Sequence, residues 1–209
     1  MNREQRHKRL RRLIKNLNKE RKLRAKKVDI LCNDLIAAHR DFIKRLDSIG
    51  FTAHFYESIL GTADLNGLFY NASNLIKEEV PDVNLAFFLR QEDSFELHMF
   101  ESERPIGLEK RHLENCFTPE LVEGICQSNK ICTLEDMFSM GLEGNLTELN
   151  KISTVTIPLG IPGVSLGFIL IYRPSENKLT TDELKNVLAI TGGLSRAIQS
   201  CKVLSRQGN

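Results

Sequence analysis

The sequence predicts an α+β fold, because a strong β-hairpin signal is followed directly by a strong helix signal near the C-terminus. Two apolar, β-rich runs, residues 152–159 and 164–172, are joined by Gly160-Ile161-Pro162-Gly163. Glycine and proline supply the dihedral angles that such a tight reversal requires. In the helix that follows, Thr180 stands three residues before Glu183 and can form a capping box with it. Apolar residues then recur at helical spacing and give one apolar stripe.

The N-terminal segment, residues 3–49, is predicted to be one long helix because it contains neither proline nor glycine. Its apolar residues recur about every 3.5 positions, which is the repeat of a coiled coil. Three arginines, at positions 21, 24 and 45, interrupt this seam and weaken it. We expect the stem, residues 1–52, to pair with a second copy of the chain, which makes the protein a homodimer. The seam residues of its best-formed part are Val28, Leu31, Leu35, Phe42 and Ile49.

The next elements are shorter, and glycine or proline separates them. Gly50 and Gly61 bracket a short helical segment, and Asp64 can cap a further helix that should end before the next proline. Residues 83–90 are predicted to form a buried strand, and residues 95–101 its hairpin partner across a polar turn. The globular domain is expected to span residues 53–209.

Between the two hairpins the pattern is less regular. Residues 102–118 have no clear period and are expected to form loops. Thr118 and Pro119 are suited to begin a helix, and a short strand is expected at residues 131–134. Residues 135–151 mix apolar, acidic and glycine residues, which favours a mobile short helix or lid.

Charge is strongly segregated along the chain. The first 27 residues hold 13 Lys or Arg and two acidic residues, whereas the rest of the chain holds 16 basic and 25 acidic residues. The basic segment is either a solvated charged helix or a linker that docks onto an acidic partner or an anionic membrane surface. Nucleic acid is a weaker alternative, because no pattern of Asn or small residues is present to read base edges.

The five cysteines occur singly, without a Cys-x-x-Cys pair, which disfavours a zinc knuckle and indicates a reducing compartment. No apolar stretch approaches the length that spans a bilayer. The basic N-terminus is not followed by the continuous apolar run of a secretory signal. We therefore expect a cytoplasmic protein.

The chain from about residue 53 to residue 204 resembles a GAF domain in the order of its elements and in several local strings. Ile59-Leu60-Gly61-Thr62-Ala63-Asp64-Leu65 is similar to the family's entry into its first helix. Residues 121–130 are similar to the helix before its third strand. Residues 156–159, 166–170 and 179–184 resemble its closing hairpin and final helix.

This resemblance implies a central antiparallel sheet of five to six strands, with the N- and C-terminal helices on one face and a small-molecule pocket on the other. GAF domains commonly bind cyclic nucleotides, bilins, haem or small metabolites, and they pass the signal through helices that pair in a parallel dimer. The resemblance therefore implies a non-catalytic sensor of signal transduction, with a homodimeric stem and a downstream signalling protein as its partner. The ligand itself stays unknown.

The motifs of particular ligands are matched only in part. Cyclic-nucleotide-binding members carry Asn and Lys, then Phe, and an Asp-Glu pair after three further residues. Here Asn177-Lys178 is followed by Leu179, and Asp182-Glu183 arrives one residue early. A haem or metal site would use His98 or His112, but neither has paired ligand spacing. The sequence therefore requires no metal and no cofactor.

A GAF-type methionine sulfoxide reductase would need reactive thiols, and Cys116, Cys126 and Cys132 lie in the relevant half of the domain. Their spacing does not match that subtype, and Cys126 and Cys132 fit buried positions. We therefore expect no enzyme, and the Cys-dependent reductase is the third reading. The second reading is a protein-interaction module with a vestigial pocket, whose basic helix docks an acidic partner, nucleic acid or membrane.

The candidate pocket residues come from the first hairpin and from the lid. Strand alternation places Ala86 and Phe88 on one face of the first strand, and His98 and Phe100 on one face of the second. The lid adds Met137, Phe138 and Met140. Each of the seven also fits an ordinary core position.

Overall fold

The computed structural model describes residues 3–62, 64–91, 94–102, 116–128, 130–144, 149 and 151–207. The chain forms two compact units, Met1–Gly50 and Phe51–Asn209. Helix α1 (Arg3–Ile59) forms the first unit and contributes its last turns to the second. None of the helices within the described ranges combines the length and the apolar character that crossing a bilayer requires.

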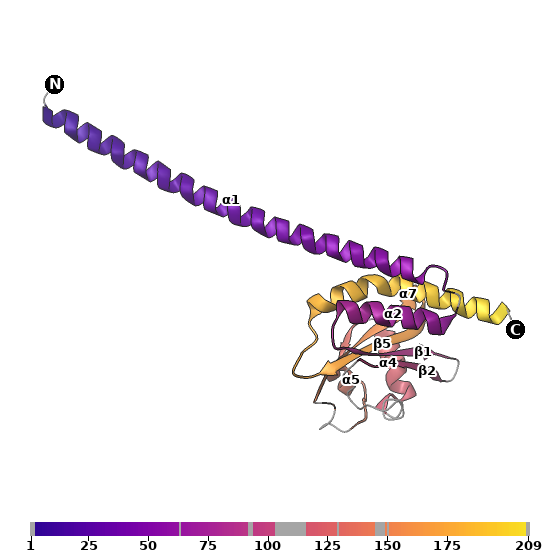
Figure 1. Ribbon diagram of the computed structural model, residues 1–209. Coiled ribbons are helices and arrows are strands. Elements are labelled where there is room, and N and C mark those ends of the chain that lie inside the picture. Colours follow the sequence, from indigo (N-terminus) through magenta and orange to yellow (C-terminus); the bar gives the residue numbers. More distant parts are fainter. Residues whose placement is uncertain are drawn as a thin grey trace. The chain divides into compact units, whose positions relative to one another are not determined.

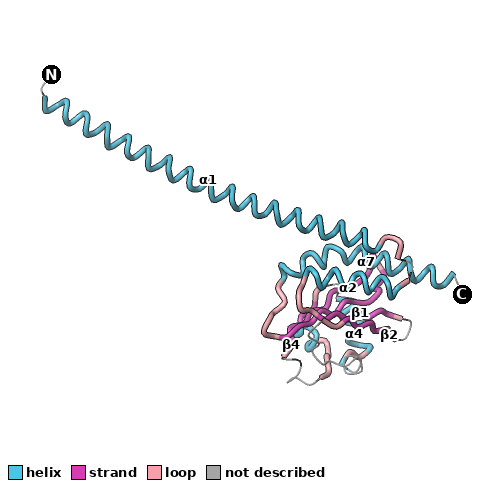
Figure 2. Tube along the Cα trace, in the orientation of Figure 1, coloured by secondary structure: helices cyan, strands magenta, loops and turns pink. Residues whose placement is uncertain are grey.

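The second unit is built on an antiparallel sheet that has five strands in the described part of the chain, in the order β2-β1-β5-β4-β3 (Figures 1 and 2). This arrangement confirms the predicted α+β class and both predicted hairpins. The strands are β1 (Asn84–Arg90), β2 (Phe95–Phe100), β3 (Cys132–Thr133), β4 (Ile152–Ile161) and β5 (Val164–Pro174).

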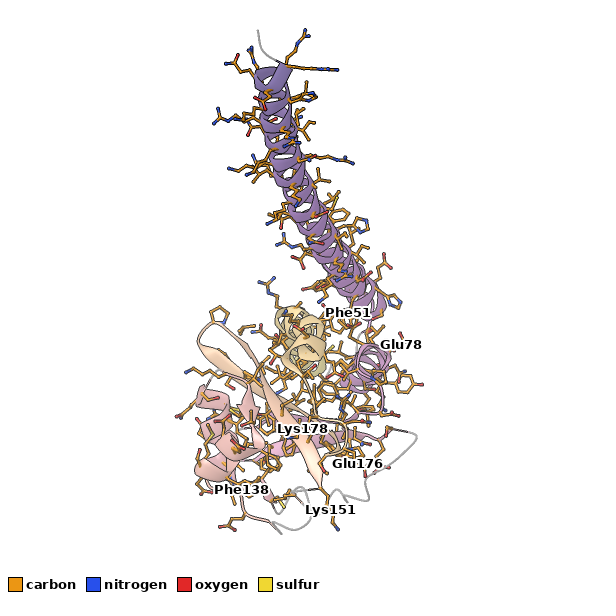
Figure 3. All side chains as sticks on the ribbon, turned by 90° about the vertical axis from the view of Figure 1, so that its left-hand side faces the viewer. Phe51, Glu78, Phe138, Lys151, Glu176 and Lys178 are labelled. Carbon is orange, nitrogen blue, oxygen red and sulfur yellow. The ribbon has the colours of Figure 1, made fainter. Side chains whose placement is uncertain are left out.

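Helices cover both faces of this sheet. On one face, α2 (Leu65–Glu79) and α7 (Thr181–Gln207) lie side by side (Figure 1). On the other face lie α4 (Pro119–Ser128) and the short α5 (Leu134–Ser139). Figure 3 labels Phe51, which packs on the α2/α7 side, and Phe138, which packs on the α4/α5 side.

Local capping explains where most of these helices begin. Asp64 Oδ1 accepts a hydrogen bond from Gly67 N at 2.7 Å, as predicted for the start of α2. Thr118 Oγ1 accepts one from Leu121 N at 3.3 Å, at the predicted start of α4. The expected helix break at Gly50 is wrong, because α1 continues to Ile59. A single glycine costs a helix only about 1 kcal/mol relative to alanine.

Strand β5 lies in the middle of the sheet and is buried on both faces. At its start, Gly167 has a φ of +138°, which favours glycine. A Cβ atom there would lie 1.8 Å from the carbonyl oxygen of Phe88 on β1. Only a residue without a side chain therefore lets β1 and β5 pair at this point.

Two separate apolar clusters result, one on each face. The α2/α7 cluster contains Phe55, Phe69, Phe87, Ile169 and Leu194, all fully buried. The α4/α5 cluster contains Phe88, Phe117, Leu121, Met137 and Phe168, all buried. Alternation along β1 and β5 sends neighbouring side chains to opposite clusters, so each cluster depends on the same two strands.

A buried arginine fixes the connection from β5 to α7. Arg173 is 6% exposed, and its Nη2 lies 2.9 Å and 3.0 Å from the carboxylate oxygens of Glu183. Its guanidinium also donates to the carbonyl oxygens of Asn177 and Lys178. Glu183 Oε2 accepts from Thr180 N and Oγ1 at 2.8 Å and 2.7 Å, which confirms the predicted capping box.

These contacts set the protonation of Glu183. Partial burial raises the pKa of its carboxyl, but the hydrogen bonds from Thr180 and Arg173 outweigh burial and hold the pKa below its usual value. The ionised Glu183 carboxylate therefore stabilises the folded state fully at pH values above its unfolded-state pKa of about 4.3. This contribution is lost as the pH falls through the lower folded-state pKa. Glu183, the second residue of the acidic pair that resembles a nucleotide-binding motif, thus has a structural role.

We predict that Glu183→Gln lowers the free energy of unfolding by about 2 kcal/mol at pH 7, because the buried Arg173 loses its charged partner, whereas glutamine can still complete the capping box. The difference from wild type should shrink as the pH falls below about 4.3 and through the lowered folded-state pKa, because wild-type Glu183 then becomes protonated itself. Urea unfolding at both pH values measures this. Asp182→Asn, which removes the adjacent exposed carboxylate, should cost less than about 0.5 kcal/mol; an equal loss in both variants would contradict the assignment.

Candidate functional site

The face of the sheet under α4 and α5 is the candidate ligand site, and stacked aromatic rings form its floor. The rings of Phe88 and Phe168, on adjacent strands, are stacked with centroids 4.6 Å apart. Phe117, which precedes α4, packs on both at 4.8 Å and 5.8 Å. This floor is rigid and apolar, since aromatic contacts of this kind add to the free energy of burial.

Beside this floor, under α5, a small and partly open cavity remains. Its volume is about 10 Å³, which is near the minimum that holds one water molecule. Its lining is almost wholly apolar, and most of it comes from α5, β4, β5 and the segments that flank α5. The lining residues are Cys116, Phe117, Leu134, Met137, Leu142, Leu149, Ile152, Thr154, Leu170 and Tyr172.

A row of polar side chains crosses the sheet at one end of this face. Asn84 on β1 pairs with Tyr172 on β5, and Tyr172 pairs with Thr154 on β4, so that all three project to the same side. Asn84 is fully buried; its Oδ1 accepts from Ser102 N at 2.8 Å. Its Nδ2 has no hydrogen-bond partner among the described residues. A buried amide donor without a partner is costly and indicates a group that a ligand can satisfy.

The three side chains of this row offer hydrogen-bond donors and carry no charge at neutral pH. Burial, with a smaller contribution from the charge of Glu101, raises the pKa of Tyr172 to about 12, so its hydroxyl stays protonated at neutral pH. Thr154 Oγ1 donates to the carbonyl oxygen of Ile171 at 3.2 Å and keeps acceptor capacity. The nearby Glu101 carboxylate disfavours an anionic ligand. The row therefore suits a neutral group that accepts hydrogen bonds.

The lid over the cavity is held by its own capping box. Thr133 Oγ1 accepts from Asp136 N at 3.3 Å, and Thr133 N donates to Asp136 Oδ2 at 2.8 Å. Hydrogen bonds from Thr133 lower the pKa of the Asp136 carboxyl, so the cap is charged at neutral pH. The six-residue helix thus places Met137 over the sheet, where its side chain is fully buried.

The seven predicted pocket residues separate into three groups. Ala86, Phe88, Met137 and Phe138 lie in or against the α4/α5 cluster. Met140 caps the C-terminus of α5, is 36% exposed and does not line the cavity.

His98 and Phe100 lie on the opposite face, which corrects the expectation that they share a lining with Ala86 and Phe88. The imidazole of His98 packs against the ring of Phe69 on α2, with centroids 4.9 Å apart and planes tilted by 45°, and its Nε2 lies 2.9 Å from Glu96 Oε1. The ring of Phe100 contacts Phe87 at 5.7 Å. The β1–β2 register pairs His98 with Phe87, so these even-numbered residues of β2 share a face with the odd-numbered residues of β1.

Sequence reasoning missed the residues that matter most here, namely Asn84, Thr154, Phe168 and Tyr172. Residues 164–172 form a continuous apolar run, which has no alternation to reveal a face. One signal was available: Tyr172 is a polar-tipped residue at the end of a buried strand, where a hydroxyl needs a partner.

The remaining candidate chemistries find little support. Burial raises the pKa of the Cys126 thiol, which works against a reactive thiolate. Among the described residues, no three of His, Cys, Asp and Glu are grouped closely enough to hold a metal ion. His112 lies outside the described residues.

A larger hollow of about 560 Å³ at the β4–β5 hairpin is open to solvent, and its lining contains Cys126 and no charged side chain.

A second candidate surface lies on the stem. The five seam residues are all strongly exposed in the single chain, from 56% for Val28 to 71% for Leu35. Large apolar side chains at heptad spacing are a surface that another helix can cover.

An antiparallel sheet with two helices on one face and a lidded apolar cluster on the other defines a small α+β domain. Comparison with solved structures shows that the second unit has the GAF fold. Comparison with models of known protein families and with curated proteins finds no match to this chain.

Three similar structures illustrate the likeness. The GAF domain of a phosphoenolpyruvate-protein phosphotransferase from Coxiella burnetii has a TM-score of 0.56 and 11% identity, covering 77% of this chain and 98% of that one. A GAF domain/HD domain protein from Geobacter sulfurreducens gives 0.55 and 13%, covering 69% and 98%. The GAF domain of a two-component sensor histidine kinase from Bacillus halodurans gives 0.51 and 16%, covering 69% and 99%. At these identities the likeness concerns the fold.

Proposed function

We propose that the chain is a non-catalytic signal-transduction module whose GAF domain binds a small, neutral, mainly apolar molecule that carries a hydrogen-bond acceptor. The stem pairs with a second copy and passes the binding signal to a downstream protein. The observation that carries the proposal is the buried row of Asn84, Tyr172 and Thr154 beside the apolar cavity under α5. None of the five cysteines forms a disulfide, which supports a reducing, cytoplasmic setting.

The chemistry of the site supports this ligand class. An apolar body would contact Leu134, Leu142 and Leu170, which line the cavity. A carbonyl or ether oxygen would accept from the Tyr172 hydroxyl and from Asn84 Nδ2, and it would relieve the unpaired buried amide. Binding sites of this kind combine an apolar lining with a few convergent polar groups.

The small cavity volume sets the condition for binding. A ligand larger than a water molecule enters only if side chains over the cavity move, and Met137 is suited to this because its unbranched chain has several rotatable bonds. Such movement would couple ligand occupancy to the position of α5. The small volume of the cavity also favours a second candidate function, an interaction module whose pocket takes no ligand.

We predict that a small cyclic ketone such as cyclohexanone raises the melting temperature of the full chain more than methylcyclohexane, a probe of similar shape without the acceptor. Tyr172→Phe should reduce this difference, because it removes the donor and keeps the ring. Differential scanning fluorimetry over a concentration series measures both effects. Tyr70→Phe is the matched control, since Tyr70 is exposed on α2, and it should leave the difference unchanged.

A second pair of variants tests the position of the site. Leu134→Trp places a larger side chain in the cavity wall and should abolish the stabilisation by the ketone. Leu188→Trp makes the same change at a half-buried position of the α2/α7 cluster and should leave the stabilisation in place. If neither probe stabilises the wild type, or if both tryptophan variants respond alike, the ligand site is refuted and the interaction module is favoured.

For the stem, we predict that Leu31→Asp/Leu35→Asp converts a dimer into a monomer, because charges at two consecutive seam positions remove the apolar contact. Sedimentation equilibrium of the full chain measures the change. Ile30→Asp/Ile36→Asp is the matched control, since these side chains are 59% and 51% exposed and lie off the seam. That variant should stay dimeric; equal effects of the two double variants, or a monomeric wild type, would argue against the seam.

A further inference from the structure

A continuous stripe of basic residues runs along one face of the stem, and the proposed binding of a small ligand does not use it. With the seam residues at heptad positions a and d, positions b and f lie on the side of the helix that faces away from the seam. From residue 8 to residue 26, all six b and f positions are basic. These residues, here called the basic stripe, are Lys8, Arg12, Lys15, Lys19, Lys22 and Lys26.

The stripe is straight, exposed and bounded. Its members follow each other at spacings of three or four residues, so they form one line about 27 Å long on a helix with 1.5 Å rise per residue. All six side chains are exposed. The ion pair of the basic segment, between Arg24 and Glu20 at 3.7 Å, involves none of them. The next b position is Asp29, where the line of positive charge ends.

We propose that the basic stripe binds the phosphate backbone of double-stranded nucleic acid without sequence preference. Six cations in a line match a polymer whose negative charges also repeat along a line. Five of the six are lysines, which bind phosphate as point charges, whereas base reading favours the bidentate geometry of arginine or asparagine. The stripe therefore supplies affinity for the backbone and no base-edge readout.

A duplex fits these observations better than a single strand or a membrane. Residues 3–27 contain no Phe, Tyr or Trp, so no aromatic platform is present on which unpaired bases would stack. Four of the five large apolar residues of the same segment, Leu10, Leu13, Ile14 and Leu17, lie on the opposite side of the helix from the stripe, and the fifth, Leu23, flanks the stripe. A helix that buried these side chains in lipid would point its cations away from the lipid headgroups.

The test is binding of the full chain to a fluorescent DNA duplex of about 20 base pairs and arbitrary sequence, followed by anisotropy at several salt concentrations. The logarithm of the affinity should fall with the logarithm of salt with a slope of about −5 for one stripe and about −11 for the two stripes of a dimer. Lys15→Gln/Lys19→Gln/Lys22→Gln should halve this slope, and at low salt it should weaken binding roughly tenfold or more.

The matched control is Arg6→Gln/Arg9→Gln/Lys27→Gln, which removes the same charge from the same segment but outside the stripe. It should change the slope by less than about 1. Equal losses in the two triple variants would show that diffuse charge, and not the stripe, binds the duplex. Absence of duplex binding at low salt would also overturn the proposal, as would binding to phosphatidylserine vesicles without binding to the duplex.

Discussion

The burial of β5 on both faces is the constraint on which the rest of the domain depends. A central strand of apolar residues needs cover above and below, and it receives α2 and α7 on one side and α4 and α5 on the other. Gly167 allows β1 to approach β5 closely enough to pair, so that Phe88 and Phe168 can stack. The two clusters therefore contain different side chains, although both take side chains from β1 and β5.

The two faces differ in how polar groups are handled. In the α2/α7 cluster, Ser195 is the polar contact to β4, and its hydroxyl accepts from Gly160 N at 3.0 Å and donates to Thr191 O at 2.7 Å. In the α4/α5 face, Asn84 is buried with a donor that no described residue satisfies. Unsatisfied buried donors persist where they serve a purpose other than stability. His98 Nε2, on the α2/α7 side, is also buried without a hydrogen-bond partner among the described residues, although Glu96 Oε1 lies 2.9 Å away. What distinguishes the α4/α5 face is the cavity beside its polar row together with the short lid, and this is why we place sensing there.

The sequence predicted those features that depend on local interactions. The hairpin ends, the Asp64 cap and the Thr180–Glu183 capping box each involve residues close in the chain, so local patterns revealed them. Strand alternation correctly separated the two faces within each strand. Alternation alone does not show which face of β2 continues which face of β1, because this depends on the register that pairs His98 with Phe87. For this reason His98 was wrongly grouped with Ala86 and Phe88. The polar row arises from three strands and was not visible in any one of them.

Signal transmission of the proposed kind requires that two stems pair in parallel and in register. The most direct measurement is disulfide cross-linking of Leu31→Cys in a Cys32→Ser background, compared with Asn33→Cys in the same background. In a parallel dimer, position 31 meets its own copy across the seam, whereas position 33 faces outward. Mild oxidation should give covalent dimers for Leu31→Cys and almost none for Asn33→Cys. Equal cross-linking at both positions, or none at position 31, would contradict a parallel stem.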